Sequence, residues 1–234
     1  MSEARAQIFG DIRARLGRGR VNEGARREAE ERLAAHRRNL VPARAASLDH
    51  AGQVALFVAE AQAVDATIVR VASAADVPGA IADFLTRQNL PAQLVMTPDP
   101  KLDAIPWDTR PMLELRRGRA EDGDAAGITG AFAAIAETGT LMLISGAGTP
   151  TRNNFLPDTH IVVLRASEIV ACYEDGWDRL RAAGPMPRTV NFITGPSRSG
   201  DIEQTLQLGA HGPRRLHVLL VDELIAAGGA GRRP

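Results

Sequence analysis

Apolar residues recur at helical spacing near the start of the chain. Ile8, Ile12 and Leu16 lie one helical turn apart, and Gly17 follows them. Residues 23–38 are mostly charged residues and alanine, a composition that favours a helix exposed to solvent or packed on a partner. The pattern predicts three helices, over residues 4–15, 23–38 and 50–64.

After the third helix, short β-branched or apolar runs alternate with helical patterns, which is typical of parallel crossover units. Helices are expected over residues 77–88 and 168–183, and another is expected to begin near Gly200 and end at Gly209. The strand runs are continuously apolar, so we expect one sheet with helices on both faces. Its predicted strands begin at Thr67, Gln93, Leu141, His160, Thr189 and Leu216.

Length and composition limit the organisation of the chain. The 234 residues, 44% of them hydrophobic, suffice for one α/β domain over residues 46–234, preceded by an N-terminal helical extension over residues 1–45. Lys and Arg balance Asp and Glu, which argues against a nucleic-acid binder. No apolar stretch approaches the roughly 20 residues of a membrane span. No signal peptide is evident either, so we expect a cytoplasmic protein.

Few residues suit a metal or a cluster. Cys172 is the only cysteine, so the chain has no internal disulfide and no four-thiolate site for an iron–sulfur cluster. The five histidines are scattered, and we expect no metal site. Lys101 is the only lysine, an imbalance toward arginine that we attribute to coding bias rather than to mechanism.

A polar turn, Glu137-Thr138-Gly139-Thr140, separates two apolar runs. A carboxylate in this position must be solvated, paired or functional, because burying it alone is costly. Gly139 allows a backbone or a ligand to approach closely. The turn is therefore a candidate site, with Glu137 in a catalytic role and three neighbours binding a ligand, namely Thr138, Gly139 and Thr140. Several roles stay open for Glu137: a nucleophile, a ligand for a substrate hydroxyl, a partner of Arg152, or a carboxylate that fixes the turn.

Two later loops carry polar residues next to predicted strands. The first precedes a predicted helix, whose free amides and dipole favour anions. Its candidate ligand-binding residues are Gly195, Ser197, Arg198 and Ser199. The second presents His211 on a backbone of small residues, either as a catalytic acid–base group or as a histidine that closes the loop through a backbone hydrogen bond.

Arg152 follows a glycine-rich loop, and its guanidinium is suited to bind a carboxylate through two hydrogen bonds. A plain surface position is the alternative. We expect the Glu137 turn and the loops around Ser197 and His211 to converge on one concave surface, because parallel strands deliver such loops to the same edge of a sheet. Arg152 is expected to add a mobile cation to that surface.

A series of short motifs runs in order from about Val64 to the last predicted strand. They are Gly-Ile-Thr (127–129), Ala-Ile-Ala-Glu-Thr-Gly-Thr-Leu (134–141), Arg-Asn (152–153), Leu-Pro-Asp-Thr-His-Ile (156–161), Gly-Pro-Ser-Arg-Ser-Gly-Asp-Ile-Glu (195–203) and Gly-Ala-His-Gly-Pro (209–213). Together they resemble the LUD-domain family, and within it the lactate-utilisation protein C group. The resemblance implies a sheet flanked by helices, similar to CoA transferases and ribose-5-phosphate isomerase.

The resemblance also implies a system that oxidises L-lactate to pyruvate, in which partner subunits carry the iron–sulfur clusters and this chain carries no cofactor. The leading hypothesis is a cytoplasmic subunit of that system that binds a small anionic metabolite or a nucleotide-type ligand at the loops of Glu137, Arg152, Ser197 and His211. Two alternatives stay open. One is a stand-alone enzyme that processes acyl-CoA or phosphosugars on the same fold. The other is a non-catalytic assembly module, whose N-terminal helices dock the iron–sulfur partner.

Overall fold

The structure, a computed structural model, divides into two units, Met1–Leu40 and Val41–Pro234. Within the described part of the first unit, α1 (Glu3–Arg15) and α2 (Glu23–Ala35) bury no residue, as expected for helices with a thin apolar stripe. The helical pattern thus predicts both elements correctly. The residues that the structure describes are 3–17, 22–38, 41–199 and 207–222.

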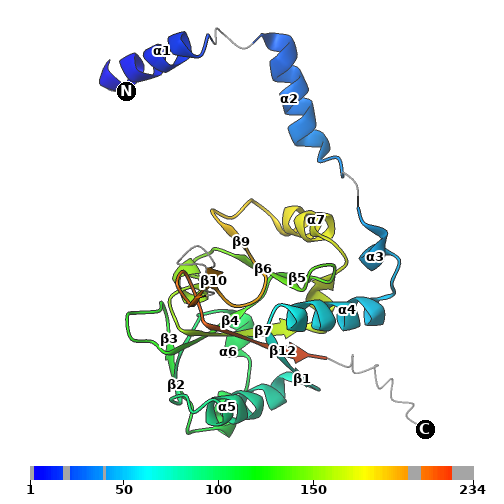
Figure 1. The fold of residues 1–234 in the computed structure, drawn as a ribbon, viewed down its shortest axis with the longest axis vertical. Coiled ribbons are helices and arrows are strands. Elements are labelled where there is room, and N and C mark those ends of the chain that lie inside the picture. Colours follow the sequence, from blue (N-terminus) through cyan, green and yellow to red (C-terminus); the bar gives the residue numbers. More distant parts are fainter. Residues whose placement is uncertain (1–2, 18–21, 39–40, 200–206, 223–234) are drawn as a thin grey trace, which may run out of the picture. The chain divides into compact units, whose positions relative to one another are not determined.

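Six parallel strands form the main sheet in the described part of the second unit, in the order β1-β12-β7-β4-β2-β3 (Figure 1). On β12, Val218 lies opposite Ile68 on one side and Val162 on the other. The predicted runs at Thr67, Gln93, His160 and Leu216 therefore do join one parallel sheet. Their bounds are β1 (Thr67–Val71), β2 (Gln93–Met96), β3 (Glu114–Arg117), β4 (Ala126–Gly130), β7 (Thr159–Arg165) and β12 (Arg215–Val221).

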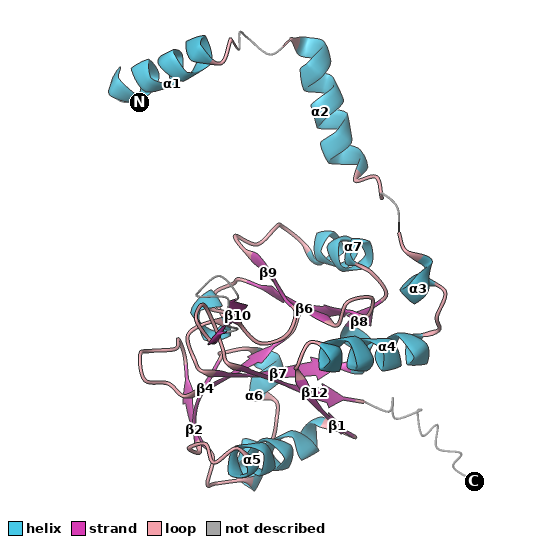
Figure 2. Ribbon diagram, in the orientation of Figure 1, coloured by secondary structure: helices cyan, strands magenta, loops and turns pink. Residues whose placement is uncertain are grey.

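Helices cover both faces of the main sheet, as the continuous apolar runs predict (Figure 2). On one face, α5 (Val77–Arg87) contributes Ile81 and Phe84 to a buried cluster with strand residues such as Ile128. On the opposite face, α4 (His50–Ala63) contributes Phe57 to a second cluster, which includes residues of β7 and β12. The two clusters make the main sheet a buried central layer.

A second sheet lies on the face that α4 covers, and its described strands run in the order β8-β5-β6-β9. Leu141 and Leu143 of this sheet belong to the same buried cluster as Phe57 of α4. The pairs β5–β6 and β6–β9 are antiparallel, and β5–β8 is parallel. The bounds are β5 (Ala133–Ile135), β6 (Thr140–Ile144), β8 (Ile169–Val170) and β9 (Val190–Ile193).

The prediction that the runs at Leu141 and Thr189 join the main sheet is wrong, since both runs belong to the second sheet. Thr140 pairs with Ile135, so the polar turn closes a hairpin between β5 and β6. A turn this short joins antiparallel strands, whereas parallel neighbours need a long crossover. An apolar run by itself indicates a buried strand but not the sheet to which the strand belongs.

The outer face of the second sheet is covered by α7 (Tyr173–Ala183), whose Leu180 clusters with Met142. The helix predicted over residues 168–183 begins only at Tyr173, because Ile169 and Val170 pair with β5. Short elements complete the described part of this unit: α3 (Ala43–Ala46), α6 (Pro100–Asp103) and the 3-10 helices Ala74–Asp76, Trp107–Thr109, Thr151–Asn154 and Ala166–Glu168.

The start of the helix expected near Gly200 falls on residues 200–206, which lie outside the described residues. Its expected last turn does not form. Leu208 lies in β11 (Gln207–Leu208), which pairs antiparallel with β10 (Arg198–Ser199). Gly209 does adopt the expected left-handed conformation, with φ of +80°. The glycine thus ends a strand rather than a helix.

Two histidines are buried in the main sheet. His217 of β12 stacks on Phe84 with ring centroids 3.8 Å apart, and its Nδ1 lies 2.7 Å from the Thr67 hydroxyl. Burial is the largest cause that lowers the pKa of His217, to about 4. His160 of β7 is fully buried, and burial lowers its pKa to about 3. Both imidazoles are therefore neutral at physiological pH.

These histidines should make the fold sensitive to acid. An unfolded histidine has a pKa of about 6.5, so below that pH the unfolded chain binds protons that the folded protein does not. The stability is complete above pH 6.5 and falls as the pH drops toward 4 for His217 and toward 3 for His160. Each histidine should contribute a slope of about 1.4 kcal/mol per pH unit. Urea unfolding of the protein and of His217→Gln, between pH 7 and 4.5, measures it.

The free energy of unfolding of His217→Gln should depend less steeply on pH than that of the unaltered protein, whatever its value at pH 7. His50→Gln is the matched control, because His50 is exposed at the start of α4. An unchanged slope in His217→Gln would contradict a neutral, buried His217.

Gly139 should tolerate no side chain. Its φ is +63°, and a Cβ atom there would lie 2.2 Å from the Ala61 backbone nitrogen. Overpacking and the left-handed conformation together predict that Gly139→Ala lowers the free energy of unfolding by about 2–4 kcal/mol. Gly123→Ala is the control in urea unfolding, because Gly123 also has a positive φ but no atom within 4 Å of its Cβ position. Equal losses in both variants would rule out the close approach.

Removal of the first unit should leave the second unit folded. No described residue of α1 or α2 is buried, whereas Ala45 in α3 is fully buried and belongs to the body. Mild trypsin treatment should therefore cleave among the arginines of residues 1–40 and stop there. Mass spectrometry and the melting temperature of the product measure this outcome. Cooperative loss of the body after cleavage would show instead that residues 1–40 belong to the folded core.

Candidate functional site

A cavity of about 240 Å³ lies between the two sheets, beyond the carboxyl ends of β2 and β4. Open parallel sheets place their ligands at this edge. Its apolar lining includes Leu143 of β6 and Ala131, which lies between β4 and β5. Its polar lining residues are Thr97, Asp99, Lys101, Thr129, Ser145, Thr149 and Asn154.

Glycines keep this cavity open. A Cβ atom at Gly130, the last residue of β4, would lie 3.2 Å from an Asp99 carboxylate oxygen. A Cβ atom at Gly148 would lie 2.7 Å from the Pro98 carbonyl oxygen. The loop of Gly148 closes on itself, since Thr149 donates its amide to the Gly146 carbonyl at 3.2 Å. A larger residue at Gly130 or Gly148 would therefore clash with Asp99 or Pro98.

Lys101, the only lysine of the chain, brings positive charge to the cavity. Asp99 caps the short helix α6 by accepting a hydrogen bond from the Lys101 amide at 2.9 Å. The Lys101 ammonium forms an ion pair with Glu168, whose side chain is 5% exposed. Glu168 also accepts the Arg165 amide at 3.1 Å. A buried carboxylate therefore holds the ammonium of a residue that lines the cavity, although Glu168 itself is not part of that lining.

Thr129 of β4 lines the cavity, and its side chain contacts a buried histidine. Its hydroxyl oxygen lies 2.8 Å from Nε2 of His160 on the adjacent strand β7. His160 is fully buried, and its Nδ1 has no hydrogen-bond partner among the described residues. The neutral imidazole therefore contacts the cavity only through the threonine.

Sequence reasoning missed this cavity. In the sequence, Lys101 stands out only by composition, and His160 only as the start of a predicted strand. A signal was present, because Asp99 and Lys101 follow the predicted strand that ends at Met96. The rule about carboxyl ends of parallel strands selects those residues once β2 is known to belong to the parallel sheet.

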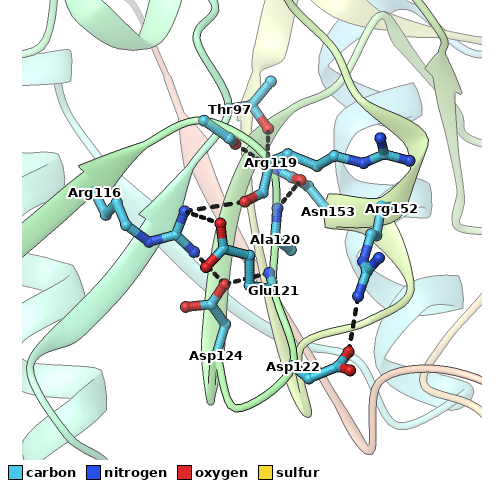
Figure 3. Close-up of polar contacts among 10 residues, drawn as sticks. Thr97, Arg116, Arg119, Ala120, Glu121, Asp122, Asp124, Arg152 and Asn153 are labelled. Atoms are coloured by element: carbon cyan, nitrogen blue, oxygen red, sulfur yellow. Dashed lines mark hydrogen bonds and ion pairs between the residues drawn. The ribbon is translucent and has the colours of Figure 1, made fainter.

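Arg152 lies on the 3-10 helix Thr151–Asn154 and forms an ion pair with Asp122 at 2.7 Å (Figure 3). The two side chains are 40% and 90% exposed, so the pair lies at the surface. No described hydrogen bond joins Arg152 to Glu137, Ser197 or His211. Of the roles left open for Glu137, a pair with Arg152 does not occur among the described contacts, where Arg152 pairs with Asp122.

The neighbouring Asn153 connects the loop after β3 to the cavity (Figure 3). Its side-chain oxygen accepts the Ala120 amide at 2.7 Å. Its side-chain nitrogen donates to the Gly118 carbonyl at 2.9 Å and to the Thr97 hydroxyl at 3.2 Å. Because Thr97 lines the cavity, this fully buried asparagine fixes one wall of it.

The predicted turn at residues 137–140 is held by a cluster of hydroxyl groups. The Thr140 hydroxyl lies 2.7 Å from those of Thr138 and Thr194 and 3.1 Å from that of Tyr173. Glu137 is half-buried, and its amide donates to the Ala171 carbonyl at 3.1 Å. These bonds give Thr138 and Thr140 structural partners within the protein.

Two glycines allow the turn at residues 137–140 and the loop after β9 to lie close to the end of α4. Gly139 approaches Ala61, and a Cβ atom at Gly195 (φ of +76°) would lie 2.4 Å from the Val64 carbonyl oxygen. The close approach of Gly139 that the sequence predicts thus exists, with a helix backbone on the other side rather than a ligand.

The loops of Ser197 and His211 come together, as expected. The Ser197 amide donates to the Pro213 carbonyl at 2.8 Å, and its hydroxyl accepts the His211 amide at 3.4 Å. Arg198 pairs with Asp65, and Ser199 lies opposite Gln207 in the β10–β11 ladder. Thr140 and Thr194 connect these loops to the Glu137 turn.

None of these predicted residues lines the 240 Å³ cavity. The His211 loop precedes β12 and so lies at the amino end of that strand, whereas the cavity lies beyond the carboxyl ends of β2 and β4. The roles of Glu137, Ser197 and His211 in binding or catalysis stay predictions.

The described residues contain neither a membrane-spanning helix nor a cluster of metal ligands. In residues 3–17, 22–38, 41–199 and 207–222, no helix is both long and apolar enough to cross a membrane. The same described residues contain no group of three or more His, Cys, Asp or Glu side chains placed to hold a metal ion.

Comparisons with known proteins agree on one family. The model of the LUD domain matches residues 54–221. A lactate utilization protein C from Deinococcus radiodurans is 36% identical over 156 residues, which is 64% of this chain and 70% of that protein. A lactate utilization protein C from Bacillus subtilis is 38% identical over 101 residues, which is 42% of each protein.

A solved structure supports the fold. The crystal structure of a DUF162 family protein from Deinococcus radiodurans matches with a TM-score of 0.57 at 31% identity, over 75% of this chain and 99% of that chain. The matched residues of the family model contain both sheets, the cavity and the loops described above. This chain belongs to the LUD-domain family.

Proposed function

We propose that this protein functions in the utilisation of L-lactate, as a subunit that binds a small carboxylate in the cavity between the two sheets. The observation that carries the proposal is the position of Lys101, the only lysine, at a cavity of a LUD domain whose relatives include proteins named lactate utilization protein C. An ammonium group suits a carboxylate, and the hydroxyl and amide groups of the lining suit its oxygens.

The size of the cavity supports a small metabolite. About 240 Å³ lies below the 300–1,000 Å³ usual for sites that bury drug-sized ligands. L-lactate and pyruvate combine one carboxylate with one further oxygen and a methyl group. The apolar lining, which includes Leu143 and Ile144, offers a surface for that methyl group.

The electron acceptor for lactate oxidation belongs on partner subunits in this proposal. Oxidation of L-lactate to pyruvate removes two electrons and two protons, so it needs a redox partner. The single cysteine, Cys172, does not fit an iron–sulfur cluster: it is buried, it caps α7, and its thiol donates to Asp175 at 3.3 Å. Burial also raises the pKa of this thiol, which disfavours the thiolate that a cluster binds. We infer a cytoplasmic assembly in which other chains hold the clusters.

Removing the charge of Lys101 should weaken binding of the acid. We choose the double variant Lys101→Met with Glu168→Gln, because Lys101→Met alone would leave the Glu168 carboxylate buried without its partner. Loss of a charge-assisted hydrogen bond should weaken binding of L-lactate or pyruvate by about 10- to 100-fold. Isothermal titration calorimetry measures the affinity, and the ligand-induced rise in melting temperature checks it.

Arg117→Gln is the matched control, because Arg117 forms an exposed ion pair with Asp103 of the same short helix α6. It should bind as the unaltered protein does. Growth on L-lactate tests the wider role: in a Bacillus subtilis strain that lacks its relative, this chain should restore growth and the double variant should not. Full binding and growth with the double variant would refute the proposed site.

A further inference from the structure

We propose that Thr129 contacts the bound acid as a hydrogen-bond donor, and that His160 is the positioning residue that directs the Thr129 hydroxyl proton into the cavity. The inference deepens the proposed function, since it rests on the cavity as the ligand site. It assigns a direction to one hydrogen bond there, and with it the chemical class of the group that the cavity selects at that point.

Thr129 and His160 form a hydrogen-bonded pair of side chains. The Thr129 hydroxyl oxygen and His160 Nε2 are 2.8 Å apart, a hydrogen bond in which either group can be the donor. Two arrangements of protons are compatible with this distance. In one, the imidazole carries its proton on Nε2 and donates to Thr129. In the other, the proton is on Nδ1, and the Thr129 hydroxyl donates to Nε2.

The surroundings of His160 decide between these arrangements. His160 is fully buried, and its Nδ1 has no hydrogen-bond partner in the described part of the chain. A proton on Nδ1 would bury an N–H donor without an acceptor, which is the rarer and costlier defect in protein interiors. A proton on Nε2 satisfies the donor with Thr129 and leaves only a lone pair unpaired on Nδ1. Burial also keeps the ring neutral, since it lowers the pKa of His160 to about 3.

This tautomer fixes the role of Thr129. A hydroxyl group has one proton to donate and two lone pairs that accept. When Nε2 donates to one lone pair, the Thr129 proton cannot point at the histidine. No other hydrogen bond of this hydroxyl occurs among the described residues, and the threonine lines the cavity. The free donor is therefore available to a ligand.

A donor at this position selects an oxygen with a lone pair. Carboxylate and carbonyl oxygens only accept hydrogen bonds, so they can take the Thr129 proton, whereas a ligand N–H group could use only the remaining lone pair of the hydroxyl and would leave that proton unpaired. Lys101 of α6, which also lines the cavity, has only donors. The two groups together favour an acid whose oxygens are acceptors, such as a 2-oxo acid.

Nuclear magnetic resonance tests the tautomer directly. Long-range proton–nitrogen correlation spectra of the full chain with labelled histidine distinguish a proton on Nε2 from a proton on Nδ1. His160→Asn assigns the signal by its disappearance. We expect the proton on Nε2. A proton on Nδ1, or a doubly protonated ring at neutral pH, would overturn the proposal.

Calorimetry with pyruvate and with L-lactate tests the contact. Thr129→Val keeps the shape of the side chain but removes the hydroxyl, and should weaken binding of pyruvate about tenfold or more. Thr129→Ser keeps the donor and should bind within a few-fold of the unaltered protein. Thr86→Val is the control, because Thr86 is exposed on α5 and donates to the Ala82 carbonyl.

The outcomes separate the two proposals. Unaltered protein that binds neither acid would contradict both the proposed function and this inference. Binding that Lys101→Met with Glu168→Gln weakens but Thr129→Val does not would contradict this inference alone. Should Thr129→Val fail to fold, the tautomer of the unaltered protein and the affinity of Thr129→Ser still decide.

Discussion

The close approach of two glycine turns to the end of α4 determines how the two sheets are spaced. Gly139 and Gly195 both reach the helix backbone at distances that no Cβ atom would allow. They bring the second sheet onto the helix, and the helix in turn fills the space over β7 and β12 through Phe57 and Ala61. The cavity lies beyond β2 and β4, where the lining residues Gly130 and Gly146 carry no side chain. Backbone contact of Gly139 and Gly195 thus positions the second sheet whose β6 forms one wall of the cavity.

The local pattern of the sequence predicts most strands and helices but not their assembly. Continuous apolar runs such as Leu216–Val221 are buried on both faces, so their strand character follows from composition alone. The assignment of β9 to the second sheet depends instead on its pairing with β6, in which Ile193 lies opposite the distant Leu141. The run ending at Leu208 shows the same limit, because its apolar spacing fits a helix while its partner strand β10 makes it a strand.

The residues that stand out in the sequence and the residues that line the cavity are different sets. Glu137, Ser197 and His211 stand out in the sequence because they interrupt apolar runs, but most of the described polar contacts around them stabilise turns. The sequence gives no functional signal at Lys101, which stands in a proline-rich segment. Its position beyond β2 matters only once the strand order is known, because the carboxyl edge of a parallel sheet is a property of the whole sheet.

The strand order also has a consequence for the synthesis of the protein. β1 pairs only with β12 among the described strands, and the Thr67 hydroxyl reaches a histidine 150 residues later. At a translation rate of 5–20 residues per second, β1 leaves the ribosome roughly 8–30 s before its partner exists. During that interval its backbone edge is open to other chains. The nascent protein therefore passes through a stage in which its earliest strand needs shielding, by α4 and α5 or by a chaperone, until the last strand of the sheet inserts between β1 and β7.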